Sequence, residues 1–238
     1  MSFPTVAWDD VARITGAQMQ QLIMLATGKY GLDSRLLVEH TARNLVQLSE
    51  ALAPEGTVLV VAGRGNNGSG GLAAARLLAA RGRRVWVVPT HEAENYSGTP
   101  KEQLEHLRYF ESVKVRTSLP KMKFSTVIDA AIGTNLEGPP RGRTLDVITV
   151  LNQLSTQGSC VIALDVPTGL QADDGELPGD VVNASATLAV GLPKIGAPPG
   201  DHVGRLFIGD LGLPEGLFEA MGLTAPKLRG FVTEVVRG

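Results

Sequence analysis

The chain has 238 residues, 43% hydrophobic and 19% charged, with a net charge of −2. This composition suits one large α/β domain or two small ones, and the lack of a basic excess argues against nucleic acid as a partner. The single cysteine, Cys160, excludes an internal disulfide framework. Because no stretch has the pattern of a signal peptide or a membrane span, we expect a soluble cytoplasmic protein without a membrane partner.

Two helices are predicted before the first strand. Apolar residues recur at helical spacing over residues 10–30, and a second helix is predicted from about Ser34, with Asp33 or Ser34 as its cap, to Leu52. No strand separates them, so we expect them to pack together on one face of a later sheet or against a partner chain. Their Met and Leu side chains favour the sheet.

The stretch from Thr57 to Leu78 is the most informative part of the sequence. Val58–Ala62 is predicted to be a buried parallel strand, and a glycine-rich loop follows over residues 63–71. A helix is then predicted to about Ala80, ended by Gly82. A strand, a glycine loop and a helix in this order bring backbone amides close to an anion such as phosphate.

This loop fits neither common nucleotide-binding pattern well. Residues 63–68 match G-x-G-x-x-G, but the next predicted strand does not end in the acidic residue that would strengthen the match, and no Gly-Lys-Ser/Thr is present. Asn66 and Asn67 are either turn residues, which tolerate left-handed conformations, or ligand-binding residues. Two asparagines inside a glycine loop at a strand-to-helix junction favour ligand binding.

The rest of the chain alternates between strands and helices. Strands are predicted at 84–89, 113–115, 126–129, 160–164, 186–192 and 205–208, and helices at 100–110 and 144–157. This alternation predicts a single domain over 1–238, with a mostly parallel sheet that has helices on both faces. The sheet core spans about 57–214, and the tail over 215–238 either packs as a short strand or helix or is loosely held.

Polar motifs follow three of the predicted strands, at 63–71, 129–138 and 165–169, where ligands bind in parallel sheets. Asp129 and Asp165 each end an apolar run, so each carboxylate needs a hydrogen bond, an ion pair or a metal. Either could cap a loop, but two at neighbouring strand ends favour a functional role. The histidines are scattered, which argues against zinc. Oxygen donors suit a hard cation such as sodium, potassium, magnesium or calcium.

In combination and order, these motifs resemble the NAD(P)H-hydrate epimerase family, which has a YjeF-type N-terminal domain. The resemblance rests on residues 65–71, 129–139 and 165–170, with further matches at 188–196 and 204–214. It implies a Rossmann-like three-layer αβα sandwich, often a homodimer. It also implies an isomerase that interconverts the R and S epimers of hydrated NADH and NADPH, a repair of nicotinamide nucleotides.

The resemblance also implies roles for individual residues. Asn67, Asp129 and Thr168 match ligands of one potassium ion per subunit, with Thr168 in place of the usual serine. Asp165 matches the catalytic carboxylate that contacts the substrate, and we expect it to move a proton to or from the hydroxyl on the hydrated ring carbon. The dinucleotide would be held by Asp165 and by the two loops that comprise Asn66, Asn67, Gly68, Ser69 and Gly70, and Gly133, Thr134, Asn135, Leu136, Glu137, Gly138 and Pro139.

The sequence departs from the family pattern in both loops. Ser69 and Gly70 stand where the family has glycine and aspartate, and Asn135 stands where glycine is usual. A catalytically silent relative that binds a nucleotide-like ligand or a protein partner is therefore the alternative to an epimerase. An NAD-dependent dehydrogenase is less favoured, because the acidic residue after the second strand is absent. The sequence leaves the preferred dinucleotide, the cation and the oligomeric state undetermined.

Overall fold

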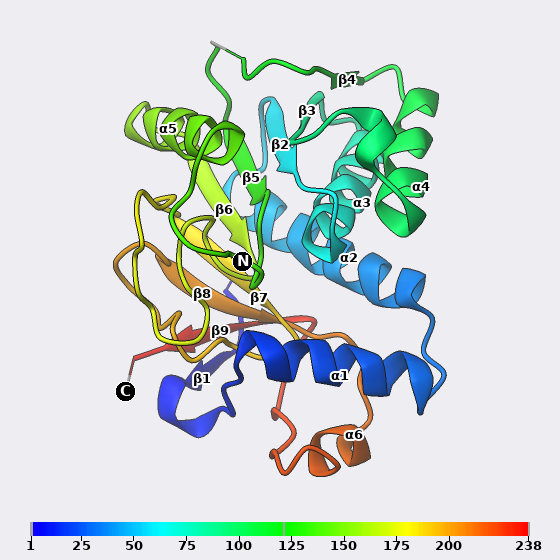
Figure 1. Cartoon of the computed structure of the whole chain (residues 1–238), viewed down its shortest axis with the longest axis vertical. Helices are drawn as coiled ribbons and strands as arrows, with labels where there is room; N and C mark the ends of the chain where they lie inside the picture. The colour runs from blue at the N-terminus through cyan, green and yellow to red at the C-terminus, as the bar shows by residue number, and fades with distance from the viewer. Residues whose placement is uncertain (1, 121, 238) are drawn as a thin grey trace.

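The computed structural model describes residues 2–120 and 122–237, and the strands within these ranges form one sheet (Figure 1). The strands are β1 (Thr5–Ala7), β2 (Val58–Ala62), β3 (Val85–Pro89), β4 (Val113–Val115), β5 (Thr126–Ala130), β6 (Cys160–Leu164), β7 (Ala186–Val190), β8 (Arg205–Gly209) and β9 (Val232–Val236). Their order in the sheet is β1-β9-β8-β7-β6-β5-β2-β3-β4. Of the pairs in this order, β8–β9 is antiparallel and the others are parallel.

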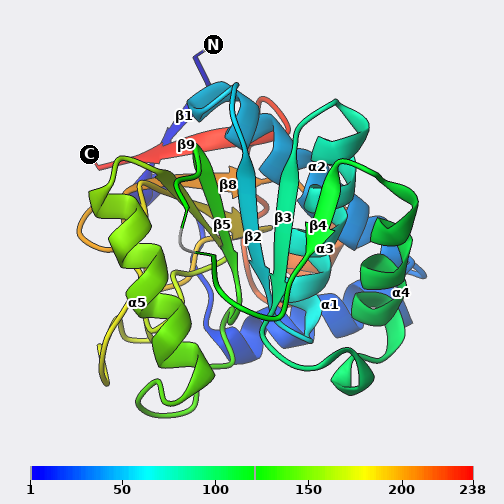
Figure 2. The same ribbon diagram turned by 90° about the horizontal axis from the view of Figure 1, so that it is seen from above.

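Helices cover both faces of the sheet. They are α1 (Gly16–Gly28), α2 (Ser34–Leu52), α3 (Asn66–Ala80), α4 (Gly98–His106), α5 (Arg143–Thr156) and the short α6 (Glu215–Glu219). Figure 2 shows α5 on one side of the strands and α2, α3 and α4 on the other. Val58 and Val60 of β2 pack with α2 and α3, whereas Leu59 and Val61 pack with α5, as the alternation of side chains along a strand requires. The predicted αβα sandwich is therefore confirmed.

The two N-terminal helices do not lie together on one face, which corrects our expectation. Most buried residues of α2 join the cluster that contains Phe207 of β8. Leu22 and Ala26 of α1 instead join a cluster with Leu206, on the opposite face of β8. The chain changes direction between the helices at Gly31, whose φ of +67° is in the region that glycine adopts without steric cost.

The C-terminal tail is part of the sheet. It contains α6 and β9, and β9 pairs with both β8 and the N-terminal β1, so the first and last strands of the chain are neighbours in the sheet. Figure 1 shows β1 and β9 in the same part of the molecule. Of the two alternatives for the tail, packing on the sheet is the one observed. The pattern analysis did not predict β1, because three residues are too few for a periodic signal.

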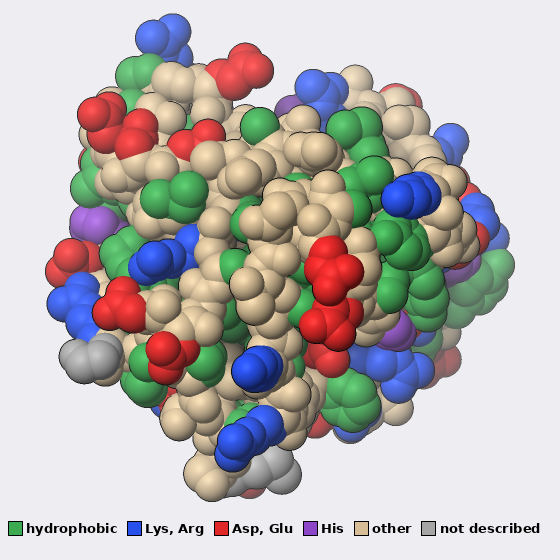
Figure 3. All heavy atoms as spheres, turned by 90° about the horizontal axis from the view of Figure 1, so that it is seen from below, with side chains coloured by type: hydrophobic (Ala, Val, Ile, Leu, Met, Phe, Trp, Pro, Cys, Tyr) green, Lys and Arg blue, Asp and Glu red, His purple; other side chains and the backbone are tan. Residues whose placement is uncertain are grey.

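The surface carries charges of both signs. Figure 3 shows the molecule turned so that it is seen from below relative to Figure 1, and basic and acidic side chains are interspersed on this face. None of the helices in the described residues is long and apolar enough to cross a membrane.

Arg83 anchors the turn that leads from α2 into β2. Its guanidinium donates hydrogen bonds to the carbonyl oxygens of Ala53, Pro54, Glu55 and Gly56 at 2.8–3.1 Å, and the residue is 9% exposed. One side chain thus donates to four consecutive carbonyls of the segment that connects α2 to β2. The start of the central strand depends on this turn.

Replacing Arg83 by methionine should lower the free energy of unfolding by about 2 kcal/mol, because four carbonyls lose the side chain that donates to them. Arg84→Met is the matched control, since Arg84 is exposed, and we expect it to change stability by less than about 0.5 kcal/mol. Urea unfolding of the two variants measures the difference. Equal stability of both would show that Arg83 does not hold the turn.

Candidate active site

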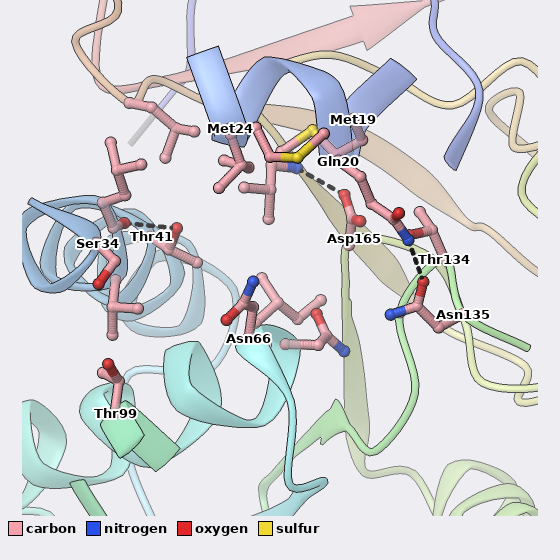
Figure 4. A pocket seen from close by; sticks show the side chains of 18 residues that line it. Met19, Gln20, Met24, Ser34, Thr41, Asn66, Thr99, Thr134, Asn135 and Asp165 are labelled. Atoms are coloured by element: carbon pink, nitrogen blue, oxygen red, sulfur yellow. Dashed lines mark hydrogen bonds between the residues drawn. The ribbon is translucent and has the colours of Figure 1, made fainter. Parts of the chain in front are cut away.

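Three adjacent strands, β2, β5 and β6, end together at one edge of the sheet. Val61, Asp129 and Ala163 are aligned across them, so the segments that follow each strand emerge next to one another. A cavity of about 370 Å³ lies at this edge. Its walls come from α1, α2, the start of α3, the loop at 133–135 and Asp165. Figure 4 shows Asp165, Asn66 and Thr41 directed towards this space from three different elements.

The glycine loop is shorter than predicted, because α3 begins at Asn66. Asn66, Asn67 and Gly68 therefore form its first turn, and the loop proper comprises residues 63–65. A Cβ on Gly68 would lie 1.7 Å from the carbonyl oxygen of Gly63, and one on Gly71 would lie 2.5 Å from Cβ of Ala130. Glycine at these positions lets the helix start directly against the strand ends, which places both asparagines at the rim of the cavity.

The two departures in the first loop, Ser69 and Gly70, lie beneath the cavity wall. Ser69 is fully buried, and its hydroxyl donates to the carbonyl of Gly65 at 3.3 Å. A Cβ on Gly70 would lie 2.9 Å from Cδ2 of Leu164 and 3.0 Å from Cγ2 of Thr41, and both of these side chains line the cavity. In this chain Thr41 and Leu164 occupy the space that an aspartate at position 70 would need.

Asp129 is a fully buried carboxylate that neutral groups surround. Its Oδ1 accepts a hydrogen bond from Oγ1 of Thr168 at 2.7 Å, and its Oδ2 accepts one from the amide of Thr168 at 2.8 Å. The amide of Ala131 adds a longer contact of 3.3 Å to Oδ1. Burial raises the pKa of Asp129 above its ordinary value, and the hydrogen bonds from Thr168 and Ala131 only partly oppose this effect.

Asn67 lies close to the turn that follows β5. Ile132 faces Thr168, whose Oγ1 accepts from the amide of Ile132 at 3.1 Å. The next residue, Gly133, passes close over Asn67, because a Cβ on Gly133 would be 3.2 Å from Cγ of Asn67. The buried Nδ2 of Asn67 has no hydrogen-bond partner among the described residues. The turn at 132–133 is thus close to both Asn67 and the Asp129–Thr168 pair.

Asp165 follows β6 in a strained backbone conformation, with a φ of +72°. It is 7% exposed and lines the cavity. Its Oδ1 accepts a hydrogen bond from the amide of Val190 at 3.0 Å and forms an ion pair with Lys194, which is completely buried. Non-glycine residues held at positive φ by surrounding structure are concentrated at functional sites.

The structure brings some of the predicted substrate residues together and leaves others apart. Asn66, Asn67, Gly133, Thr134, Asn135 and Asp165 line the cavity. Leu136, Glu137, Gly138 and Pro139 line a separate depression, and Gly68, Ser69 and Gly70 are buried in the first two turns of α3 without lining the cavity. Asn135 also contacts α1, since its Oδ1 accepts from Nε2 of Gln20 at 2.9 Å.

Sequence reasoning missed two parts of the site. The first is an apolar wall made of residues of α1 and α2: Met19, Ile23, Met24, Leu37 and Val38. Their helical spacing predicts burial, not a cavity. The second is Lys194, the partner of Asp165. A lysine within the apolar sequence 188–197 was a usable signal, because a buried ammonium group needs an acidic partner.

This fold and site are those of an α/β protein that binds its ligand at the carboxyl ends of parallel strands. The family described as "YjeF-related protein N-terminus" matches residues 34–196. The chain belongs to this family.

Relatives match along most of the chain. The NAD(P)H-hydrate epimerase of Truepera radiovictrix is 61% identical over 210 residues, which are 88% of this chain and 94% of the relative. That of Dehalogenimonas lykanthroporepellens is 33% identical and covers 99% of this chain and 97% of its own. The crystal structure of yeast YNL200c superimposes with a TM-score of 0.83 over 94% of this chain and all of that one, and at 19% identity it supports the fold alone.

We expect Gly70→Asp to lower the free energy of unfolding by about 2 kcal/mol and not to raise any activity, because the new carboxylate must be desolvated between Leu164 and Thr41. Gly65→Asp is the control, since no atom lies within 4 Å of a Cβ at position 65. Adding Thr41→Ala to the Gly70→Asp variant should recover part of the loss. Thermal unfolding of these variants measures the changes in stability. Equal destabilisation by aspartate at positions 65 and 70 would show that Thr41 and Leu164 do not fill the space next to position 70.

Proposed function

We propose that the chain is an isomerase that interconverts the R and S epimers of hydrated NADH and NADPH. The observation that carries the proposal is a single cavity in which Asp165 and the pair Asn66–Asn67 meet. Membership of the YjeF-related family and the names of relatives that match nearly the whole chain support it.

The cavity has the chemical character that a nicotinamide group requires. One wall is apolar, with Met19, Ile23 and Leu37, and suits the ring. Another part of the lining is polar, with Asn66, Thr134 and Asn135, and suits the ribose and the amide. The first turn of α3 adds backbone amides that have no intrahelical acceptor, and these favour a phosphate group.

Asp165 is the residue to which we assign proton transfer. Inversion at the hydrated carbon requires one of its bonds to break and to re-form on the opposite face. When a carboxylate takes the proton of the hydroxyl group, the hydroxyl oxygen forms a carbonyl as the bond from that carbon to the ring nitrogen breaks and leaves its electron pair on the nitrogen. Attack of the nitrogen on the opposite face of the carbonyl and return of the proton give the other epimer. Asp165 combines the required acid–base group with access to the cavity, whereas Asp129 is fully buried and hydrogen-bonded to Thr168.

We propose that Asn67, Asp129 and Thr168 hold one potassium ion. The donor set fits a monovalent cation, because it offers a single negative charge, on Asp129, together with neutral amide and hydroxyl oxygens. Asp129 has no positively charged partner among the hydrogen bonds of the described residues, and burial of its charge is costly until a cation balances it. When bound, the ion would supply electrostatic positioning of a hydroxyl group or water at the floor of the site.

We also propose, from the family resemblance, that the protein works as a cytoplasmic homodimer. Large exposed apolar side chains such as Phe231, which is 72% exposed, offer contact area for a second copy. Sedimentation velocity would measure the oligomeric state directly. A monomer at micromolar concentration would overturn the proposal of a homodimer.

The first test is an assay that starts from the R epimer of hydrated NADH, freed of the S form, and follows the appearance of the S form. We expect the wild type to exceed the spontaneous rate and Asp165→Asn to lose about 100- to 1,000-fold, because the base is removed. Asp146→Asn, at an exposed position on α5, is the control. Binding of the dinucleotide without any acceleration would instead support a catalytically silent binding protein.

A second test concerns the cation. The melting temperatures of the wild type and of Asp129→Asn are measured in tetramethylammonium buffer, and the second is subtracted from the first. This difference should fall as the pH rises above about 4. The raised pKa of Asp129 means that the folded protein keeps a proton that the unfolded chain has released, so this stability is present at low pH and lost as the pH rises.

Potassium at about 100 times its dissociation constant should then raise the melting temperature of the wild type by about 5 °C at pH 8. Asp129→Asn should not respond. An equal response of both proteins to potassium would place the ion elsewhere. The measurement does not depend on activity.

A further inference from the structure

The ion pair between Asp165 and Lys194 is the feature whose role extends beyond the proposed function. Lys194 is fully buried and Asp165 is 7% exposed, so the contact is shielded from water. A charged lysine without a partner would be very costly in such a place. Retaining a buried charge at the cavity therefore has a stability cost that a functional role would explain.

All three protons of the Lys194 ammonium group have acceptors. Nζ donates to Oδ1 of Asp165, to the carbonyl of Leu192 at 3.0 Å and to the carbonyl of Val190 at 3.2 Å. Lys194 is not among the residues that line the cavity. It therefore acts on a substrate only through Asp165.

The two oxygens of Asp165 have different surroundings. Oδ1 accepts from both Lys194 and the amide of Val190, whereas no hydrogen bond to Oδ2 is found among the described residues. Because Asp165 lines the cavity, Oδ2 is the oxygen left to meet the substrate. The backbone at Asp165, with its φ of +72°, needs surrounding contacts to hold it in this orientation.

Lys194 is also joined to the wall of the cavity. Its two neighbours pair with Ile14, with the amide of Ile14 donating to the carbonyl of Pro193 at 3.0 Å and the amide of Ile195 donating to Ile14 at 3.1 Å. Ile14 directly precedes Thr15, the N-cap of α1. One turn therefore connects the acid–base group to the helix that carries Met19 and Gln20.

We infer that Lys194 is the positioning residue of Asp165: it anchors Oδ1, balances the charge of the carboxylate and leaves Oδ2 as the oxygen that exchanges the proton with the substrate. This inference rests on the proposed function. Lys194 does not itself transfer a proton, because its three protons are held by buried acceptors.

The test is a double-mutant cycle of Asp165→Asn and Lys194→Met in the epimerase assay. We expect Lys194→Met to lower kcat at least 100-fold with KM changed by less than threefold, since the substrate contacts remain. Adding Lys194→Met to Asp165→Asn should change the residual rate by less than threefold, because Lys194 acts through Asp165. Lys227→Met, at an exposed lysine, is the control and should match the wild type.

Several outcomes would overturn the inference. These are a kcat of Lys194→Met within threefold of the wild type, a rise in KM alone, or a further loss of rate when Lys194→Met is added to Asp165→Asn. If Lys194→Met alone fails to fold, the double variant decides, because removing both charges leaves neither unpaired. A double variant that folds, with the residual rate of Asp165→Asn, supports the inference, and one that also fails to fold shows a purely structural role.

Failure of the proposed function would look different. A wild type that does not accelerate epimerisation refutes the function, whatever the variants do. The ion pair can still be tested by urea unfolding, in which each single variant should have a lower midpoint than the double variant. Equal midpoints for a single variant and the double variant would overturn the pairing itself.

Discussion

The close approach of α3 to the ends of β2 and β5 is the constraint on which the rest of the site depends. A methyl group at Gly68 would meet the backbone of Gly63 at 1.7 Å, so the helix could not start where it does. With that start displaced, Asn66 and Asn67 would leave the cavity rim. The glycines of this segment therefore serve packing between helix and strands first, and ligand access follows from that packing.

Two buried carboxylates lie at this edge of the sheet, and they differ in the groups that contact them. Asp129 is surrounded by neutral donors from Thr168 and Ala131, which satisfy its oxygens without balancing its charge. Asp165 has a full positive partner in Lys194 and retains access to the cavity. A charge without a positive hydrogen-bond partner among the described residues and a charge already balanced by Lys194 suit the two tasks that we propose for them, namely holding an ion and moving a proton.

The cavity also shows why a departure from a family motif has to be judged in three dimensions. Gly70 stands where the family motif has an aspartate. In this chain Leu164 and Thr41 occupy the space that the aspartate side chain would need. Ser69, which adds a Cβ to the motif, is buried and bonded to Gly65, away from the cavity. Neither residue lines the cavity. Each can therefore affect a ligand only by packing against neighbouring residues that do line it.

The order of strands and helices, the parallel sheet and the clustering of three motifs at strand ends were all predictable from the sequence. Each depends on local signals, namely apolar runs, glycines and residues that directly follow a strand. The start of α3 at Asn66, the separation of α1 from α2, the place of β9 between β8 and β1, and the pairing of Lys194 with Asp165 were decided by tertiary structure alone. These features depend on which surfaces meet across long stretches of chain, and 29 residues separate Lys194 from its partner. Periodicity within one segment carries no information about such contacts.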